Sequence, residues 1–178
     1  MKIAISGVQC TGKTTLLNAL KKVNALKDYN FIPEVIRGIV KSKGISINEN
    51  STDSGQIAIL NAHLDNLKNE NFIADRSLID CMAYTVYAFN HHQITPGTFW
   101  KIVSAFRDNV KNYDLIFYIK PEFEMQEDGV RSTNKSFRDE VKGYMEKALN
   151  GLRVVYLTGP VEDRVKQFMD AFYDKESE

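Results

Sequence analysis

An eight-residue motif near the N-terminus restricts the possible folds of this chain more than any other feature. Residues 7–14 read GVQCTGKT and fit the pattern G-x-x-x-x-G-K-[ST]. The apolar run at 2–6 predicts a buried strand before the motif, and leucines at helical spacing predict a helix over 14–27 after it. Because this pattern binds phosphate when it joins a strand to a helix, the sequence predicts a phosphate-binding loop.

The residue types in this loop suit a nucleotide. Glycines let the backbone N–H groups point at phosphate oxygens, and the N-terminus of the following helix adds the positive end of its dipole. Lys13 would reach the β- and γ-phosphates, and the Thr14 hydroxyl would bind Mg²⁺. We therefore predict that ATP and Mg²⁺ bind at the loop residues Gly7, Gln9, Cys10, Thr11, Gly12, Lys13, Thr14 and Thr15.

Strand and helix patterns alternate along the rest of the chain. Short apolar runs predict four further strands, at 29–33, 71–75, 114–120 and 152–158. Amphipathic stretches predict helices at 35–40, 52–67, from Ser77 onward, 96–112, 134–149 and 161–173, followed by a frayed tail at 174–178. Five short strands that alternate with helices indicate an α/β fold with a mostly parallel sheet and helices on both faces.

Size and charge exclude several classes of protein. A chain of 178 residues suits one domain over 1–178, and its 23 basic and 23 acidic residues leave no net charge. Proteins that hold duplex DNA by its phosphates usually carry a basic excess, so a nucleic-acid partner is not favoured, although a local basic patch stays open. Two cysteines form no disulfide framework, and no apolar run reaches the roughly 18 residues of a membrane span. We expect a soluble cytoplasmic protein, without a prediction of its oligomeric state.

Two carboxylates end predicted strands. Glu34 follows the second strand and Asp75 ends the third, at the sheet edge where α/β folds bind ligands. Asp75 would hold Mg²⁺, the alternative being a role in capping the helix that begins near Ser77. Glu34 would orient or deprotonate an acceptor hydroxyl, the alternative being an exposed acid at a helix start.

Other polar residues are candidates for binding the acceptor. Arg37 lies one turn after Glu34, and Arg76 lies next to Asp75. Gln56 would hydrogen-bond a base, with an exposed surface glutamine as the equal alternative. The three histidines have no metal-ligand spacing, so we expect structural or surface roles for them.

The stretch at about 121–140 is long enough to form a lid. Arg131 and Arg138 in this stretch would neutralise charge that develops on a transferring phosphoryl group. The alternative is a solvated helix face on which these arginines pair with Asp139 and Glu140.

The motifs together resemble those of the P-loop nucleoside and nucleotide kinases. The branch with the ribosylnicotinamide kinase domain of a bacterial NAD regulator and small phage kinases is especially similar. The similarity rests on the phosphate loop, the segments IPEVIR (32–37), DRSLID (75–80) with Ala83 and Tyr84, QEDGVR (126–131) with Arg138, and VYLTG (155–159) with Arg164. The segment at 75–80 also resembles the Asp-Arg-Tyr region of thymidylate kinases, but Ser77 replaces the tyrosine and no glutamine follows Tyr84.

The resemblance implies a three-layer α/β/α fold with strand order 2-3-1-4-5. It implies transfer of the ATP γ-phosphate to a nucleoside or deoxynucleotide, with a deoxynucleotide kinase as the leading interpretation. Arg131 and Arg138 would clamp the transferring group, and the loop 158–160 would lie near the adenine. The acceptor would face Glu34, Arg37, Asp75 and Arg76.

Three alternatives stay open: a kinase that acts on a nucleotide or modified base within DNA, a ribosylnicotinamide-type nucleoside kinase, and a partner-regulated P-loop ATPase. A GTPase is not favoured, because the sequence at 134–137 (NKSF) lacks the aspartate of the Asn-Lys-x-Asp motif.

Overall fold

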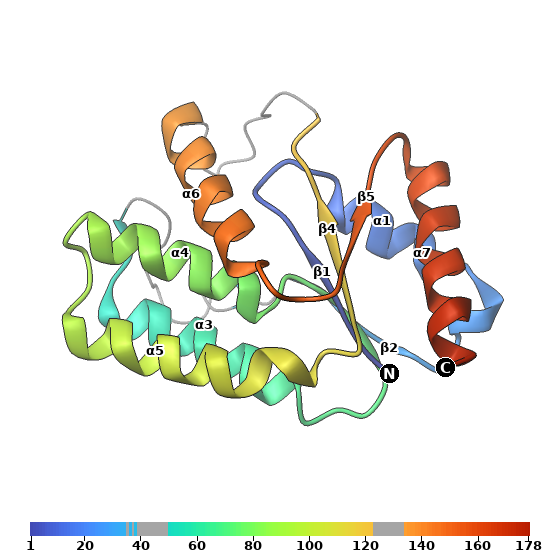
Figure 1. Ribbon diagram of the computed structural model, residues 1–178, viewed down its shortest axis with the longest axis horizontal. Coiled ribbons are helices and arrows are strands. Elements are labelled where there is room, and N and C mark those ends of the chain that lie inside the picture. The colour runs from blue at the N-terminus through green and yellow to red at the C-terminus, as the bar shows by residue number, and fades with distance from the viewer. Residues whose placement is uncertain (35, 37, 39–49, 123–133) are drawn as a thin grey trace.

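The computed structural model describes residues 1–34, 36, 38, 50–122 and 134–178. The strands in this part of the chain are β1 (Lys2–Ser6), β2 (Asn30–Ile32), β3 (Phe72–Asp75), β4 (Leu115–Ile119) and β5 (Val154–Leu157). They form one parallel sheet in the order β2-β3-β1-β4-β5 (Figure 1). The predicted α/β class and the strand order 2-3-1-4-5 are therefore confirmed.

Helices cover both faces of the sheet and give the predicted three layers (Figure 1). One face carries α1 (Lys13–Leu20) and α7 (Val161–Glu176), and the other carries α3 (Asp53–Asn66), α4 (Leu78–Asn90), α5 (Pro96–Asn109) and α6 (Lys135–Ala148). Successive strand residues alternate between the two layers: Ile3 and Ile5 pack in the core beneath α1 and α7, and Ala4 packs in the core on the opposite face. None of the helices in the described residues is long and apolar enough to cross a membrane.

Local capping explains where several helices begin. The Thr52 side chain accepts a hydrogen bond from the Gly55 N–H at the start of α3. Ser77 and Asp80 form a reciprocal capping box at the start of α4. These hydrogen bonds satisfy backbone donors that the first turn of a helix leaves free.

Helix α1 is shorter than predicted. It ends at Leu20, and a 3₁₀ turn (Asn24–Leu26) follows, so the second half of the predicted helix over 14–27 is wrong. Val23 has extended backbone with φ −83° and ψ 117°. The chain turns back there toward β2 while Leu26 still packs in the core cluster of α1. The leucine spacing indicates which side chains are buried, but not where the chain reverses direction.

The first three residues of the tail, 174–176, are helical rather than frayed, which corrects that part of the prediction for 174–178. Helix α7 continues to Glu176 because Phe172 is buried against the sheet layer. The Glu178 carboxylate pairs with Arg153 at 2.6 Å and with Lys175 at 2.5 Å. These contacts hold the last turn in place.

Candidate active site

Two glycines shape the phosphate loop between β1 and α1. An added Cβ on Gly7 would lie 2.7 Å from the carbonyl oxygen of Ile119 in β4, which is closer than atoms can approach. Gly12 has a φ of 87°, and an added Cβ there would lie 3.0 Å from Nη1 of Arg164. The predicted strand, loop and helix are all present, and a larger residue would clash with β4 at Gly7 and strain the backbone at Gly12.

Lys13 is buried, with 5% of its surface exposed. Its ammonium donates to the carbonyl oxygens of Gly7 and Val8, both at 2.7 Å, and to Thr11 Oγ1 at 3.4 Å. Burial and the nearby positive charge of Arg76 lower the pKa of Lys13 to about 8. The loop curls around the ammonium, so in this structure Lys13 bonds the loop's own oxygens.

Thr14 and Asp75 meet beside the loop. Thr14 Oγ1 donates to Asp75 Oδ2 at 2.6 Å, and Asp75 lies opposite Ile5 in the pairing of β3 with β1. The carboxylate is 2% exposed, and its Oδ1 has no hydrogen-bond partner among the described residues. A hydroxyl beside a carboxylate with a free oxygen fits Mg²⁺, which takes few protein ligands and otherwise binds water and phosphate. The described residues contain no cluster of three metal-binding side chains.

Arg76 and Glu34 form a buried ion pair across the ends of β3 and β2. Arg76 Nε donates to Glu34 Oε1 at 2.5 Å, and Arg76 Nη1 donates to Asp80 Oδ1 at 3.3 Å. Burial opposes the charge on Arg76, but Glu34 and other negative groups hold its pKa well above the ordinary value. The backbone of Arg76 has a φ of 80°, which strains a residue with a side chain. Such strain is typical of functional sites.

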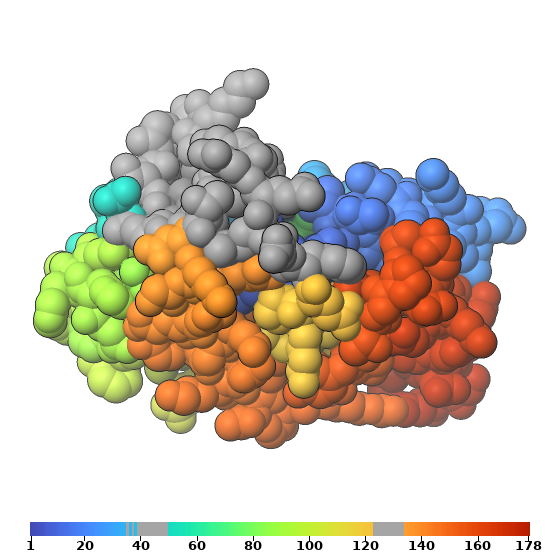
Figure 2. Space-filling model, turned by 90° about the horizontal axis from the view of Figure 1, so that it is seen from above, coloured from blue at the N-terminus to red at the C-terminus, as the bar shows by residue number. Residues whose placement is uncertain are grey.

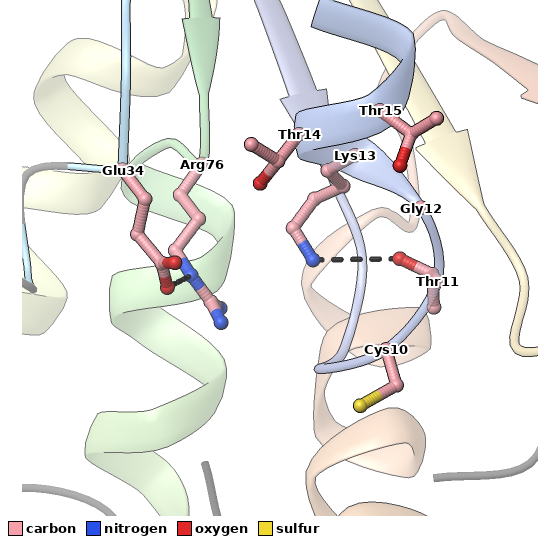
Figure 3. Close-up of a pocket in the computed structure, with 8 residues that line it drawn as sticks. All are labelled: Cys10, Thr11, Gly12, Lys13, Thr14, Thr15, Glu34 and Arg76. Carbon is pink, nitrogen blue, oxygen red and sulfur yellow. Dashed lines mark hydrogen bonds and ion pairs between the residues drawn. The ribbon is translucent and has the colours of Figure 1, made fainter. Parts of the chain in front are cut away.

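A pocket of about 60 Å³ lies between this ion pair and the phosphate loop. Figure 3 shows the Lys13 ammonium facing the Thr11 hydroxyl on the loop side, with Glu34 and Arg76 on the other side. Most of the predicted site residues described by the structure are therefore brought together around one opening. The lining residues are Cys10, Thr11, Gly12, Lys13, Thr14, Thr15, Glu34 and Arg76.

Other predicted residues lie elsewhere. Gln56 is not exposed: it is buried between α3 and α4, where its Nε2 donates to Ser51 Oγ at 3.2 Å and its Oε1 accepts from Thr85 at 3.0 Å. Arg138 is buried in α6 and does not line the pocket. Arg37 and Arg131 lie outside the described residues, as does most of the predicted lid.

The structure adds to the loop a buried arginine that was not among the predicted site residues. Arg164 of α7 donates from Nη1 to the carbonyl oxygen of Thr11 at 2.6 Å and from Nη2 to Glu122 at 2.7 Å. The same carboxylate accepts a hydrogen bond from the Gly159 N–H at 3.1 Å. Arg164 thus joins the phosphate loop to the end of β4 and to the turn before α7. The only signal in the sequence was its place in the kinase resemblance.

Two further side chains were missed on the acceptor side. Asp80 contacts Arg76 and also accepts a hydrogen bond from the Gly7 N–H at 3.4 Å. Tyr84 donates from its hydroxyl to Gln9 Oε1 at 3.0 Å. The capping pattern after Ser77 marks Asp80, but no pattern predicts a contact between residues 75 positions apart.

A groove of about 650 Å³ runs between α1 and α7. The blue N-terminal and red C-terminal parts lie side by side there in both views (Figures 1 and 2). Thr15 lines both this groove and the pocket of the phosphate loop, so the two are neighbours. The groove is lined by Thr15, Asn18, Ala19, Lys22, Val161, Glu162 and Val165.

Solved structures of kinases share this fold. Deoxyadenosine kinase from M. mycoides with dCMP and dCDP is similar with a TM-score of 0.67 and 17% identity, over 98% of this chain and 99% of that one. The NadR protein in complex with NR is similar with a TM-score of 0.74 and 22% identity, over 97% of this chain and 50% of that one. Thymidylate kinase from Candida albicans is similar with a TM-score of 0.66 and 15% identity, over 98% of this chain and 91% of that one. This chain therefore spans half of NadR and nearly all of the other two.

Sequence comparison identifies the family. No curated protein sequence matches the chain significantly. A family model described as AAA domain matches residues 2–164, which is nearly the whole chain. The predicted resemblance to P-loop nucleoside and nucleotide kinases is confirmed in the fold. The loop, the sheet order and this match agree: the chain belongs to the AAA domain family and has the fold of P-loop nucleoside and nucleotide kinases.

Proposed function

We propose that this protein is a kinase that transfers the γ-phosphate of ATP, with Mg²⁺, to a nucleoside or deoxynucleotide, a deoxynucleotide being the favoured acceptor. The observation that carries the proposal is the Glu34–Arg76 ion pair, which faces the phosphate loop across one pocket. An ATPase needs the loop and a site for water. A buried carboxylate and guanidinium at the opposite wall suit an organic acceptor with a hydroxyl or a phosphate. In this proposal the whole chain acts as one kinase domain with a lid at about 121–140.

The donor side is supported by the loop contacts. Lys13 would exchange its hydrogen bonds with Gly7 and Val8 for phosphate oxygens. Thr14 and the free oxygen of Asp75 would hold Mg²⁺, which when bound neutralises charge on the phosphates. The groove between α1 and α7 begins at Thr15, so the donor nucleoside would leave the loop past this residue and approach the turn at 158–160.

The acceptor side is supported by the position of Glu34. Arg76 donates from Nε to Glu34 Oε1 at 2.5 Å, and both side chains line the pocket. With a nucleoside, Glu34 would accept the proton of the attacking hydroxyl. With a nucleoside monophosphate, Arg76 would pair with the acceptor phosphate. Arg37 and Gln56 stay proposed acceptor contacts, and Arg131 and Arg138 stay proposed clamps of the transferring group.

A ligand screen followed by a transfer assay tests the proposal. Thermal shift would be measured with MgATP plus deoxynucleosides, deoxynucleoside monophosphates, nicotinamide riboside or a short DNA, because a ligand of the native state raises Tm. Labelled ATP then shows which compound receives phosphate. We expect transfer to a deoxynucleoside monophosphate. Hydrolysis of ATP without transfer of phosphate to any of these compounds would instead identify an ATPase.

Nicotinamide riboside is included in the screen because of one comparison. NadR in complex with NR has the highest TM-score of the three structures described, 0.74. Transfer to nicotinamide riboside but not to deoxynucleotides would select this second candidate.

A further inference from the structure

Tyr84 on α4 touches both walls of the pocket region. Its hydroxyl donates to Gln9 Oε1 in the phosphate loop at 3.0 Å. The Arg76 guanidinium lies over its ring, with Cζ at 5.4 Å from the ring centroid. Arg76 in turn holds Glu34 through the 2.5 Å hydrogen bond from Nε. One side chain thus connects the loop to the proposed acceptor pair.

The contact with Gln9 is the first step of this connection. Gln9 is 3% exposed and lies in the loop next to Cys10, whose backbone has a positive φ of 58°. Among the described residues its Nε2 has no hydrogen-bond partner, so the bond from Tyr84 anchors the amide. A broken hydrogen bond in a buried site leaves a desolvated polar atom, which is costly. The Gln9 side chain and the Tyr84 hydroxyl therefore stay together.

The contact with Arg76 is the second step. Burial raises the pKa of Tyr84, and Arg76 opposes this shift, so the phenol stays protonated near neutral pH and remains a donor. Arg76 is strained at its backbone and is fixed on its other sides by Glu34 and Asp80. The Tyr84 ring packs against the guanidinium, which also lines the pocket. A shift of the ring would therefore change the position of the Arg76 guanidinium in the pocket.

We propose that Tyr84 is a positioning residue that keeps the Glu34–Arg76 pair aligned with the phosphate loop through Gln9. The inference rests on the proposed kinase function, because it assigns the acceptor side to this pair. Phosphate transfer requires the acceptor atom to lie in line with a phosphate held by the loop. Tyr84 and Gln9 can therefore affect the rate of transfer without touching the acceptor.

Kinetics of matched variants test the alignment. Tyr84→Phe removes only the hydroxyl, and Tyr144→Phe is the control, since its hydroxyl bonds Asn90 and Glu140 between α4 and α6, outside the pocket lining. We expect Tyr84→Phe to lower kcat about tenfold with less than a twofold change in KM for ATP, and Tyr144→Phe to leave kcat unchanged. Gln9→Met should lower kcat no further in the Tyr84→Phe background; KM for ATP is fitted separately, because Gln9 lies in the loop that we expect to bind ATP. Additive losses, or equal effects of both tyrosine variants, would overturn the proposal.

A spectroscopic test needs no acceptor and no nucleotide. In protein labelled with ¹⁵N-arginine, the Arg76 Nε–H signal is assigned by its loss in Arg76→Lys. Gln9→Met should change the chemical shift of this signal when Tyr84 is present. The same substitution should leave the chemical shift unchanged in the Tyr84→Phe variant. An equal shift in both backgrounds shows that Gln9 reaches Arg76 by another route and overturns the proposal. If the protein transfers phosphate to no acceptor, the proposed function fails while this test of the Gln9–Tyr84–Arg76 connection still stands.

Discussion

The hydroxyl of Thr14 donates a 2.6 Å hydrogen bond to the carboxylate of Asp75, which joins the first turn of α1 to the end of β3. The two residues are 61 positions apart, and they meet because β3 is the direct neighbour of β1. Glu34 lies after β2, one strand further from the loop. The two carboxylates therefore stand on different sides of the proposed reaction.

Substitution of each carboxylate by its amide separates these roles. Asp75→Asn should lower both phosphate transfer and acceptor-free ATP hydrolysis by about 10²-fold, or about 2.7 kcal/mol, because both reactions use the metal site. Glu34→Gln should lower transfer far more than hydrolysis. The measurement is ADP release without acceptor and product formation with it. If Glu34→Gln suppresses both to the same extent, the carboxylates are not divided in this way.

Replacement of Lys13 by methionine should abolish transfer without unfolding the protein. The ammonium is required for phosphate, so we expect a loss of at least about 10³-fold, equivalent to about 4 kcal/mol. The lowered pKa of Lys13 means that burial already penalises its charge, and methionine fits the same volume without a charge. Calorimetry should therefore give a Tm equal to or above that of the parent. Retained transfer in this variant would remove the kinase proposal.

Arg164→Lys should weaken ATP binding. A lysine cannot hold Thr11 and Glu122 at once with the fixed geometry of a guanidinium, so the phosphate loop loses its support from α7. We expect KM for ATP to rise about tenfold, or about 1.4 kcal/mol, with a lower Tm. The control is Arg153→Lys, since Arg153 is exposed and pairs only at the surface with Glu178. Equal KM values for the two variants would show that Arg164 has no role in the donor site.

His63 should make the protein sensitive to acid. Its ring is buried in α3 with neither nitrogen hydrogen-bonded among the described residues, and burial, together with Arg76, lowers its pKa to about 3. Below pH 6.5 the unfolded chain binds a proton that the folded state excludes. Stability should therefore fall as the pH drops from 6.5 toward 3, by about 1.4 kcal/mol per pH unit from this residue.

Urea unfolding at several pH values between 4.5 and 7.5 measures this effect. His63→Leu should flatten the fall in stability over this range. His92→Asn is the control, because His92 is exposed and has a φ of 56° that asparagine tolerates. An unchanged slope in His63→Leu would show that His63 takes up its proton in the folded state.

The phosphate loop and the helix caps could be predicted from the sequence because their causes are local. Gly7 and Gly12 have φ values of 156° and 87°, which side-chain-bearing residues rarely adopt, although the close approach of Ile119 to Gly7 is set by the packing of β4. The Ser77–Asp80 capping box joins residues three positions apart, so it forms within the first turn of the helix. The alternation of apolar runs likewise indicated a parallel α/β sheet, since such strands are buried on both faces. The strand order came only from the family resemblance.

Partners across the sheet were decided by the tertiary structure. Arg76 and Glu34 are 42 positions apart, and Arg164 and Thr11 are 153 apart, so only the sheet order and the packing of α7 bring each pair together. The same holds for Lys13: its residue type identified the site, but the curl of the loop buried its ammonium. Hydrogen bonds within a few residues are encoded by the neighbouring sequence, whereas a buried contact between distant segments depends on where every intervening element packs.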